Sequence, residues 1–474
     1  MNEFDFGVVG LGVMGSNILL NVADHGFSAA GLDLSPEKAT AFEQSAKAGQ
    51  KVFGTVSAAD FAKSLKTPRA IMLLVPAGIP VDSAIESLLP FLEAGDIVID
   101  GGNSYFPDTN RRFKSLKDKE IHFFGMGISG GESGARFGPS MMPGGDKQAY
   151  ERLRPIFEAI AAKVNGEPCV AYLGNGSAGN YVKMVHNGIE YAIMQLISEV
   201  YDLLKRGLGC PDADIQKLFA QWNESELQSF LLQITADILQ KEDPETGKLV
   251  VNTISDWARS KGTGKWTSQN AMDLQAPIPS IDAAVSMRNM SSHKQERVEA
   301  ATLLNGISGN NAENTIDQTL LAQLKNAYYF AMINIYAQGL AQITIASKEY
   351  QYDVNLQEVT KIWRGGCIIR AACLEDFRAA FSANPKLANI LLDEKIGKPV
   401  ADKHPDAVAV AKLAMDNQIP VSVLLSSIAY FDSYRSAMLP TNLIQAQRDY
   451  FGAHQYERTD REGLFHTIWE ADKP

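Results

Sequence analysis

Short apolar runs alternate with amphipathic segments over about the first 175 residues. The amphipathic segments repeat apolar residues every three to four positions, as helices do. The apolar runs predict strands over residues 6–9, 28–32, 70–75, 96–100 and 121–125. This alternation is typical of a parallel sheet with helices on both faces. Ligands of such sheets bind at the carboxyl ends of the strands, so the loops after these runs are the first candidates for a site.

The segment DFGVVGLGVMGSN joins the first predicted strand to a helix through Gly10, Gly12 and Gly15. In a G-x-G-x-x-G turn the first glycine permits the tight turn, the second lets the backbone approach a pyrophosphate, and the third lets helix and strand pack closely. The motif alone also fits a plain turn. Asp33 follows the next predicted strand, at the position where dinucleotide-binding folds place an acidic residue against the adenosine ribose. Its presence favours a dinucleotide site over a plain turn. The expected cofactor-binding residues are Gly10, Leu11, Gly12, Val13, Met14, Gly15, Asp33, Leu34, Ser35, Val75, Pro76, Ala77 and Asn103.

The pattern changes near Gly179, where strands give way to long stretches with helical spacing. The predicted fold is therefore an α/β Rossmann-type, doubly wound parallel sheet followed by a large all-α domain and a tail. We expect a dinucleotide-binding domain over residues 1–177, an all-helical domain over 178–436 and a C-terminal tail over 437–474. KLFAQWNESELQSFLL around Trp222 resembles EVTKIWRGGCIIRAACL around Trp363, and a long helix precedes each tryptophan. This echo indicates an internal duplication.

A glycine-rich segment, residues 125–145, follows the fifth predicted strand. Its Ser129-Gly130-Gly131 offers a hydroxyl group and unhindered N–H groups, which suit a carboxylate or hydroxyl near the cofactor. A long flexible loop is the alternative, and the position directly after a sheet strand argues against it.

A polar cluster lies in the stretch VKMVHNGIEY, residues 182–191. Lys183, Asn187 and Glu190 are spaced i, i+4 and i+7, so a helix presents them on one face. A solvated stripe of charges would give the same spacing. The repeat around Trp363 has tyrosines and alanines near the places of Asn187 and Glu190, so only the first copy is expected to carry this cluster.

Composition narrows the classes of partner and compartment. The formal net charge of −11 argues against binding of nucleic acid or of an anionic membrane. No apolar run approaches the roughly 20 residues of a membrane-spanning helix. The four cysteines lack the spacing of metal ligands, so no metal is expected. A reduced, cytoplasmic protein without a signal peptide is the simplest interpretation.

These motifs, in this order, resemble the family of decarboxylating 6-phosphogluconate dehydrogenases over nearly the whole chain. The segments that carry the resemblance are GLGVMG, DGGNS, GISGGE, GPSMMPGG, YVKMVHNGIEY, KGTGKWT, GGCIIRA, QAQRDYFGAH and FHTIW. The resemblance implies oxidative decarboxylation of 6-phosphogluconate to ribulose 5-phosphate, a step of the pentose phosphate pathway. It also implies a homodimer in which each C-terminal tail enters the other subunit.

The resemblance also implies roles for single residues. Lys183 would be the general base and Glu190 the general acid, with Asn187 beside them. The expected substrate-binding residues are Asn103, Ser129, Gly130, Gly131, His186, Asn187, Tyr191, Lys261, Thr263 and Arg288, joined by Arg448 and His454 from the neighbouring tail. A lysine base needs a lowered pKa, and an ionised Glu190 would oppose this. We therefore expect Glu190 to be neutral, or Lys183 to lose its proton only after substrate binds.

The cofactor choice rests on a departure from the family. Most members have Asn-Arg at the end of the second strand, and the arginine pairs with the 2'-phosphate of NADP. This chain has Asp33 and Leu34 there, and Pro76 stands where many relatives have a lysine. A carboxylate accepts the ribose hydroxyls of NAD and repels a phosphate. NAD is thus the expected cofactor, NADP is the family-typical alternative, and Lys38 is a cation that would soften the preference.

Three other interpretations are open. A shorter β-hydroxyacid dehydrogenase of the 3-hydroxyisobutyrate type shares the glycine turn, the Ser-Gly-Gly loop and the Lys-Asn pair, but it does not need the phosphate cluster of Lys261, Arg288, Arg448 and His454. A redox-sensing protein without catalysis would not need Lys183 and Glu190. A nucleotide-sugar dehydrogenase would need a cysteine nucleophile, and Cys367 is more simply a packing residue.

Overall fold

The computed structural model describes residues 3–304, 306 and 317–469. The chain divides into two compact units, residues 1–427 and 428–474. The expected division at residues 177 and 436 stays a prediction. The junction of the two units lies within a helix, nine residues before the start of the expected tail.

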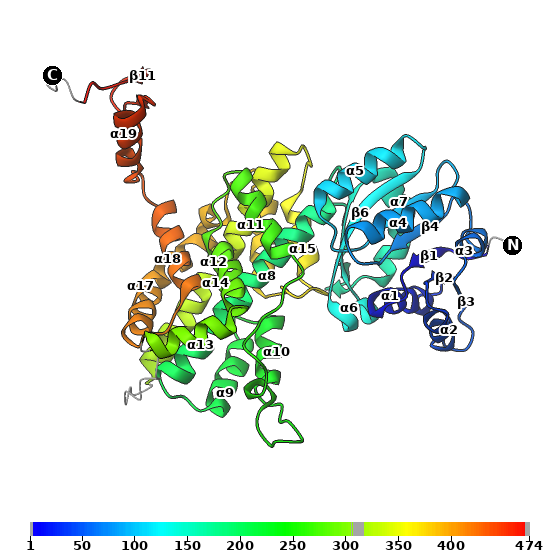
Figure 1. Cartoon of the computed structure of the whole chain (residues 1–474), viewed down its shortest axis with the longest axis horizontal. Coiled ribbons are helices and arrows are strands. Elements are labelled where there is room, and N and C mark those ends of the chain that lie inside the picture. The colour runs from blue at the N-terminus through cyan, green and yellow to red at the C-terminus, as the bar shows by residue number, and fades with distance from the viewer. Residues whose placement is uncertain (1–2, 305, 307–316, 470–474) are drawn as a thin grey trace. The chain divides into compact units, whose positions relative to one another are not determined.

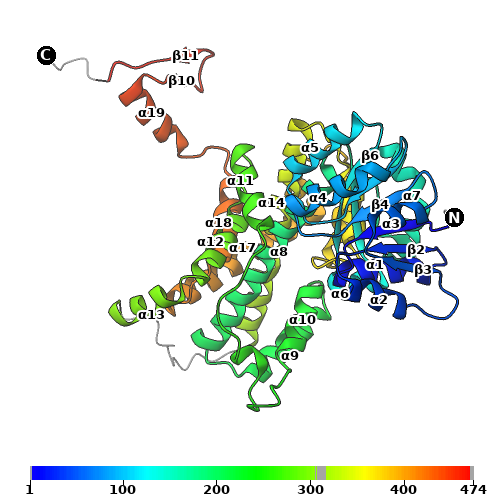
Figure 2. The same ribbon diagram turned by 45° about the vertical axis from the view of Figure 1, so that its right-hand side comes forward.

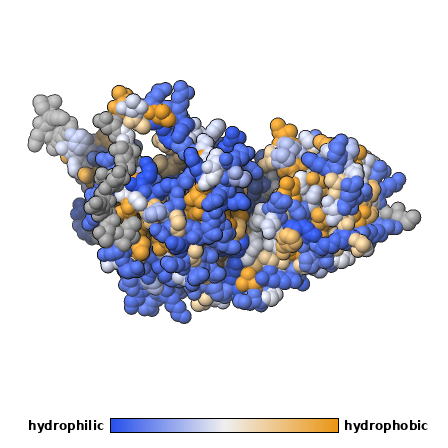
Figure 3. Space-filling model, turned by 90° about the horizontal axis from the view of Figure 1, so that it is seen from below, coloured by the Kyte–Doolittle hydropathy of each residue, from blue (hydrophilic) through white to orange (hydrophobic). Residues whose placement is uncertain are grey.

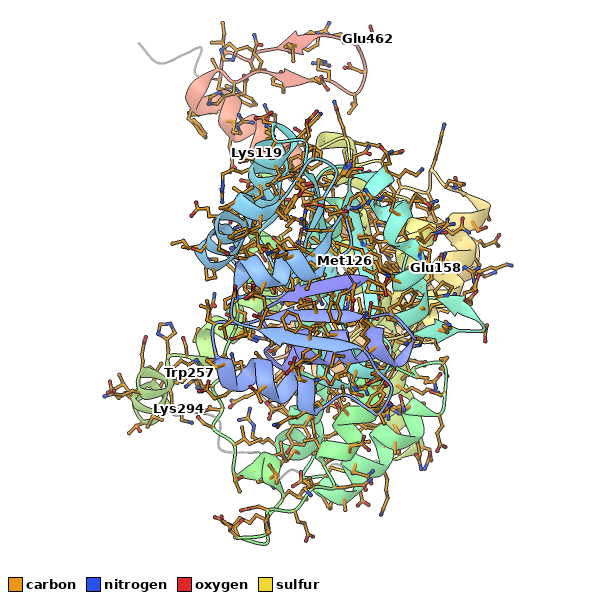
Figure 4. All side chains as sticks on the ribbon, turned by 90° about the vertical axis from the view of Figure 1, so that its right-hand side faces the viewer. Lys119, Met126, Glu158, Trp257, Lys294 and Glu462 are labelled. Carbon is orange, nitrogen blue, oxygen red and sulfur yellow. The ribbon has the colours of Figure 1, made fainter. Side chains whose placement is uncertain are left out.

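Seven strands form one sheet in the order β3-β2-β1-β4-β5-β6-β7. They are β1 (Phe6–Val9), β2 (Ala29–Leu32), β3 (Val52–Thr55), β4 (Ala70–Leu73), β5 (Ile97–Asp100), β6 (His122–Ser129) and β7 (Ser140–Gly145). All neighbours run parallel except β6 and β7. Met126, labelled on β6 in Figure 4, is completely buried, as expected for a sheet covered on both faces.

Helices cover both faces of this sheet (Figures 1 and 2). One hydrophobic core joins the sheet to α1 (Val13–Asp24), α2 (Pro36–Gln44), α6 (Gly131–Phe137) and α7 (Lys147–Ile160). The other joins it to α3 (Ala58–Ser64), α4 (Ile79–Leu88) and α5 (Phe106–Lys117). The doubly wound Rossmann-type fold and the large helical part that follows it are confirmed.

Two strands escaped the sequence analysis. Residues 52–55 form β3, whose half-buried positions lack a clear apolar run. Residues 140–145 form β7, whose SMMPGG sequence reads as a loop because proline and glycine weaken strands. On the side away from β6, the N–H of Met141 donates to the carbonyl of Cys169 at 3.0 Å and the carbonyl of Pro143 accepts the N–H of Leu173 at 2.8 Å. The proline is tolerated because β7 is the last strand of the sheet and the missing N–H of Pro143 faces this outer edge, away from the β6 ladder. The glycine-rich segment is thus mainly strand and helix, and the long flexible loop is ruled out.

The rest of the first unit is mainly helical over the residues that the structure describes, and it includes a hairpin of two short strands, β8 (Lys163–Val164) and β9 (Glu167–Pro168). The two long helices α8 (Ala178–Asp202) and α14 (Gln318–Glu349) lie side by side in Figures 1 and 2. The other helices are α9 (Asp212–Asn223), α10 (Phe230–Ile238), α11 (Thr263–Asp273), α12 (Pro279–Ser291), α13 (Lys294–Leu303), α15 (Leu356–Trp363), α16 (Cys373–Ala383), α17 (Glu394–Asp416) and α18 (Ser422–Tyr434).

Glycines let α8 pack directly on the β6–β7 hairpin. A Cβ atom at Gly127 would lie 2.2 Å from the Cβ of Lys183, and one at Gly144 would lie 2.3 Å from the backbone nitrogen of Gly179. Such distances leave no room for a side chain. The glycine-rich segment therefore serves as the floor on which the helix with the polar cluster rests.

The second unit contains α19 (Thr441–Gly452) and a hairpin of β10 (Tyr456–Glu457) and β11 (Leu464–Phe465). The buried carboxylate of Asp449 organises it, because it accepts hydrogen bonds from the backbone of Gln455 and Thr467 and from the indole of Trp469. More than half of the surface of several apolar side chains is exposed, namely Met438, Leu443, Ile444, Tyr450, Phe451, Leu464 and Ile468.

Hydrophilic residues dominate the molecular face in Figure 3, with apolar residues scattered among them. Among the described residues, no helix is long and apolar enough to cross a membrane. The same part of the chain has no cluster of three or more His, Cys, Asp or Glu side chains suited to a metal ion.

Candidate active site

The glycine turn between β1 and α1 has the geometry that the motif predicts. Gly10 adopts φ +99°, a conformation that favours glycine. A Cβ atom at Gly15 would lie 1.8 Å from the carbonyl oxygen of Gly10, so the third glycine is required for close packing. A Cβ atom at Gly12 would meet nothing within 4 Å. The space above Gly12 lies at the N-terminus of α1, where unpaired N–H groups attract phosphate, so these residues fit a dinucleotide.

A cavity of about 760 Å³ adjoins this turn at the carboxyl ends of β1, β2 and β4. Its lining includes Gly10, Asp33, Leu34, Ser35, Val75 and Pro76, and Lys38 is the one basic residue among the lining residues. Of the other expected cofactor residues, Leu11 is buried, Met14 is partly buried, and Val13, Ala77 and Asn103 are exposed.

Asp33 is held by the backbone around this cavity. One carboxylate oxygen accepts the N–H of Leu11 at 2.7 Å, and the other accepts the N–H of Ser35 at 3.0 Å. Lys38 lies 3.7 Å from the same carboxylate. Leu34 is 96% exposed and has no charge to offer a ligand. The end of β2 is therefore a carboxylate in a fixed position beside an exposed apolar side chain.

The polar cluster of α8 lies inside the protein, with Lys183 and His186 buried and Asn187 and Glu190 partly buried, so the solvated stripe is ruled out. Lys183 is 6% exposed and His186 is completely buried. The amine of Lys183 lies 3.4 Å from Nδ1 of His186, and this nitrogen lies 3.0 Å from Oδ1 of Asn187. Glu190 approaches the same imidazole nitrogen at 3.9 Å. The four side chains thus form one connected group on α8.

Burial shifts the ionisation of this group toward its neutral forms. Burial lowers the pKa of Lys183, and the nearby Glu190 opposes the change. Burial raises the pKa of the Glu190 carboxyl, with Lys183 and Arg288 acting in the opposite direction. Burial, aided by Lys183, also lowers the pKa of His186 well below its ordinary value. An amine that loses its proton readily next to a carboxyl that keeps its own is suited to acid–base chemistry.

Ser129 links this group to the Ser-Gly-Gly loop. Its hydroxyl lies 3.2 Å from Nε2 of His186 and accepts the N–H of Ile368 at 3.3 Å. The next two residues, Gly130 and Gly131, adopt φ +126° and +63°. The segment around Ile368 escaped the sequence analysis as part of the site, because a backbone N–H leaves no signal in the residue types.

The residues expected to bind phosphate fall into two groups. Asn187 donates to the hydroxyl of Thr263 at 3.1 Å, which ties α8 to the start of α11. The guanidinium of Arg288 lies over the ring of Tyr191 at 3.5 Å. Lys261 is exposed and precedes α11.

Arg448 and His454 are exposed in the second unit. There Arg448 donates to Gln445, and the His454 ring packs against Phe451.

Sequence reasoning also missed Asn180. This buried side chain lies on α8 one turn before Lys183, donates to the carbonyl of Gly102 at 3.3 Å and accepts from Thr109 at 3.1 Å. It therefore fixes the loop of Asn103 to the helix of Lys183. The only signal would have been its helical spacing from Lys183.

Comparison with known proteins covers almost the whole chain. Residues 5–174 match the family model described as the NAD binding domain of 6-phosphogluconate dehydrogenase, and residues 179–469 match that of the C-terminal domain of the same enzyme. A decarboxylating, NADP(+)-dependent 6-phosphogluconate dehydrogenase of Bacillus subtilis is 51% identical over 99% of this chain and 100% of its own. Its Escherichia coli counterpart, named without a cofactor, is 47% identical with the same coverage. The solved 6-phosphogluconate dehydrogenase of Plasmodium falciparum superposes with a TM-score of 0.94 at 42% identity, over 98% of this chain and 100% of that one.

Proposed function

The chain belongs to the 6-phosphogluconate dehydrogenase family, and from this premise we propose that it converts 6-phospho-D-gluconate to D-ribulose 5-phosphate and CO₂. Gly10, Gly12 and Gly15 would hold a nicotinamide cofactor, which would supply the acceptor for the hydride that leaves C3. The observation that carries the proposal is the connected group of Lys183, His186, Asn187 and Glu190, buried at its first two members, next to Ser129. This is the place where a sugar acid meets both an acid and a base.

Lys183 is the general base in this proposal. Its neutral amine takes the proton of the 3-hydroxyl group while the hydride leaves C3, and the product is a β-keto acid. Loss of CO₂ then leaves an enolate. The ammonium that Lys183 has become stabilises that negative charge, so the step needs no metal ion.

Glu190 is the general acid. Burial raises the pKa of the Glu190 carboxyl, which favours its protonated form, and in this proposal it protonates C1 of the enediol. His186 and Asn187 hold the sugar acid with Asn103 and the Ser129-Gly130-Gly131 loop. Tyr191, Lys261, Thr263 and Arg288 bind the 6-phosphate, completed by Arg448 and His454 of a neighbouring tail.

Steady-state turnover tests the proposal. With a nicotinamide cofactor, the enzyme is expected to release one CO₂ and one ribulose 5-phosphate for each 6-phosphogluconate consumed. Turnover of a 3-hydroxyisobutyrate-type substrate without turnover of 6-phosphogluconate would instead identify a general β-hydroxyacid dehydrogenase. Binding of the cofactor without any turnover would identify a redox sensor.

We further propose that NAD is preferred over NADP. The carboxylate of Asp33 and the exposed Leu34 give a 2'-phosphate no cation, and Lys38, already 3.7 Å from Asp33, is the single basic residue of the cavity lining. Each oxygen of Asp33 accepts one backbone hydrogen bond and can accept another from a ribose hydroxyl. Loss of charged hydrogen bonds worth about 1.5–3 kcal/mol each favours NAD by roughly 10²-fold.

The ratio of kcat/KM for NAD and NADP measures this preference. Replacing Asp33 by Asn together with Leu34→Arg is expected to move the ratio toward NADP, and Leu34→Gln serves as the uncharged control. A higher kcat/KM for NADP in the parent enzyme would contradict the NAD proposal and leave the reaction itself untouched.

We propose that the enzyme is a homodimer with exchanged tails. The second unit is ordered around Asp449 and yet exposes a row of apolar side chains. The first unit also exposes apolar residues near Lys261. Trp257, which lies close to Lys294 in Figure 4, is 50% exposed, and Met290 is 52% exposed. Burial of such surface against a second copy would stabilise the pair.

Mixing two impaired variants, one without the base and one with weakened substrate binding, tests the shared site. Arg448→Ala removes a charged phosphate contact, and substrate affinity is expected to fall about 10–100-fold. Under subunit exchange, Lys183→Met and Arg448→Ala chains are expected to regain activity, because a heterodimer contains one intact site. No regain, with exchange confirmed by mass spectrometry, would show that each tail serves its own chain.

A further inference from the structure

A second cavity, of about 310 Å³, lies away from the candidate active site where the two halves of the helical part meet. The start of α10 and the segment before α16 form one wall. The N–H of Phe230 donates to the carbonyl of Arg370 at 3.0 Å, and the N–H of Ala372 donates to the carbonyl of Gln228 at 2.9 Å. Besides Arg370, the polar lining consists of Asn165, Asn223, Gln228, Ser229, Gln233, Arg364 and Glu375, and the Glu375 carboxylate is paired with Arg364.

The two arginines of this cavity differ in their partners. Arg364 is paired with the carboxylates of Glu167 and Glu375. Arg370 donates from one nitrogen to the carbonyl of Cys367 at 2.8 Å, and its guanidinium lies 3.7 Å above the ring of Phe230. No salt bridge joins Arg370 to a carboxylate in the described part of the chain, and burial lowers its pKa.

A half-buried guanidinium without a counter-charge is costly, because it gives up water and gains no anion. The ring of Phe230 and the carbonyl of Cys367 fix its plane, and within residues 3–304, 306 and 317–469 its other N–H groups have no acceptor. A planar guanidinium held in this way is suited to bidentate contact with a carboxylate or a phosphate. The amides of Asn223, Gln228 and Gln233 add neutral hydrogen-bonding groups to the same lining.

We propose that this cavity binds a small oxyanion, the carboxylate or phosphate group of a metabolite, on Arg370. Its volume is at the lower end of ligand pockets, which limits the occupant to a small molecule. The net charge of −11 makes general attraction of anions weak, so binding depends on this local cation.

The cavity is also connected to the active site. Arg370 bonds the carbonyl of Cys367, and the next residue, Ile368, donates its N–H to Ser129, whose hydroxyl contacts His186. An anion that binds Arg370 therefore contacts a residue that is hydrogen-bonded to the turn at Cys367 and Ile368, and this turn positions Ser129. Through this turn, a bound anion can change the affinity of the active site for its substrate.

Titration calorimetry of inorganic phosphate and, separately, of malonate tests the proposal. The enzyme is first saturated with 6-phosphogluconate in the absence of cofactor, so that the active-site phosphate residues are occupied. We expect one site per chain for at least one of the two anions. Arg370→Met is expected to weaken that binding at least tenfold. Arg154→Met, which changes an arginine outside the cavity lining that is paired with Glu151 and Glu158, is expected to leave it within twofold.

Gln228→Glu gives a second test if Arg370→Met does not fold. Gln228 is exposed, so the change is tolerated, and a carboxylate in the lining is expected to weaken anion binding at least fivefold. An Arg288→Met background separates this site from the proposed reaction, since it removes the candidate phosphate arginine and is expected to leave binding intact. Absence of binding in the parent, or equal binding in the parent and in both cavity variants, would overturn the proposal.

Discussion

The two long helices α8 and α14 occupy equivalent positions in the two halves of the helical part, but they differ in the polarity of their buried side chains. Lys325 of α14 lies 142 residues after Lys183 of α8, and Ala371 lies 142 residues after Ser229, its partner in an isolated antiparallel bridge. Trp222, which follows α8 in the chain, packs on Tyr328 of α14 at 5.7 Å, while Trp363, which follows α14, packs on α8. This reciprocal packing supports the predicted duplication.

The corresponding lysines show what the difference means. Lys325 is 30% exposed and forms a salt bridge of 2.9 Å with Glu226. Lys183 is buried, with a histidine as its nearest polar neighbour. Near the place of Glu190, α14 has the buried, apolar Met332. Helix α8 thus places ionisable groups in the interior, where their pKa values shift. Helix α14 places mainly apolar side chains in the interior and packs against α8.

Replacing each lysine by methionine tests this contrast with the largest expected effect. Lys183→Met keeps the helix and removes the amine, so kcat is expected to fall about 10²–10⁴-fold, the scale of general acid–base catalysis, with little change in cofactor affinity. Lys325→Met loses a surface salt bridge of about 0–1 kcal/mol and is expected to keep kcat within twofold. Steady-state kinetics and a cofactor titration measure both. Similar losses in the two variants would refute the assignment of the base.

Sequence reasoning predicted the fold and the contrast between the halves, because periodicity and glycine placement carry that information. It located Lys183, Asn187 and Glu190 on one face of a helix. It could not tell that Asn180 bonds the carbonyl of Gly102, or that Ser129 accepts the N–H of Ile368. Both contacts involve backbone groups of distant segments, which every residue type offers equally. The strand β7 was missed because its neighbours in the sheet, rather than its residue types, stabilise it.

A second ionisable group of α8 yields a test of stability. Glu199 is buried and accepts the N–H groups of Val423 and Leu424 at the start of α18 at 2.9 and 3.1 Å. Burial raises its pKa to about 7, above the ordinary 4.5. The folded state therefore holds this proton more tightly than the unfolded state, and the carboxyl's contribution to stability decreases as pH rises from 4.5 to 7. In contrast to Glu199 of α8, the buried polar groups of α14 include the amides of Gln338 and Gln342, which do not titrate.

Glu199→Gln removes the titration. The variant is expected to gain stability relative to the parent as pH rises from 4.5 to 7, by at most about 3 kcal/mol at about 1.4 kcal/mol per pKa unit. Urea unfolding at several pH values measures this. Glu226→Gln is the control, because Lys325 outweighs burial and lowers the Glu226 pKa. This variant is expected to show no trend between pH 4.5 and 7 and to lose stability relative to the parent only as pH rises toward 4.5 from below. A difference between Glu199→Gln and the parent that does not change with pH would contradict the buried ionisation.

The tryptophans provide the test with the smallest expected effect on activity. Trp363 is completely buried against the ring of His186 at 5.6 Å, and its indole N–H has no hydrogen-bond partner among the described residues. Trp363→Phe thus keeps an aromatic ring and loses only volume. Trp222→Phe makes the same change against Tyr328. Both variants are expected to lose about 1–3 kcal/mol of folding stability. Only Trp363→Phe is expected to lower kcat/KM, by about 3–10-fold, because His186 loses its support next to Lys183. Equal kinetic losses in the two variants would show that Trp363 acts through the fold as a whole, and unchanged kinetics in both would show that Asn187 and Ser129 suffice to hold the imidazole.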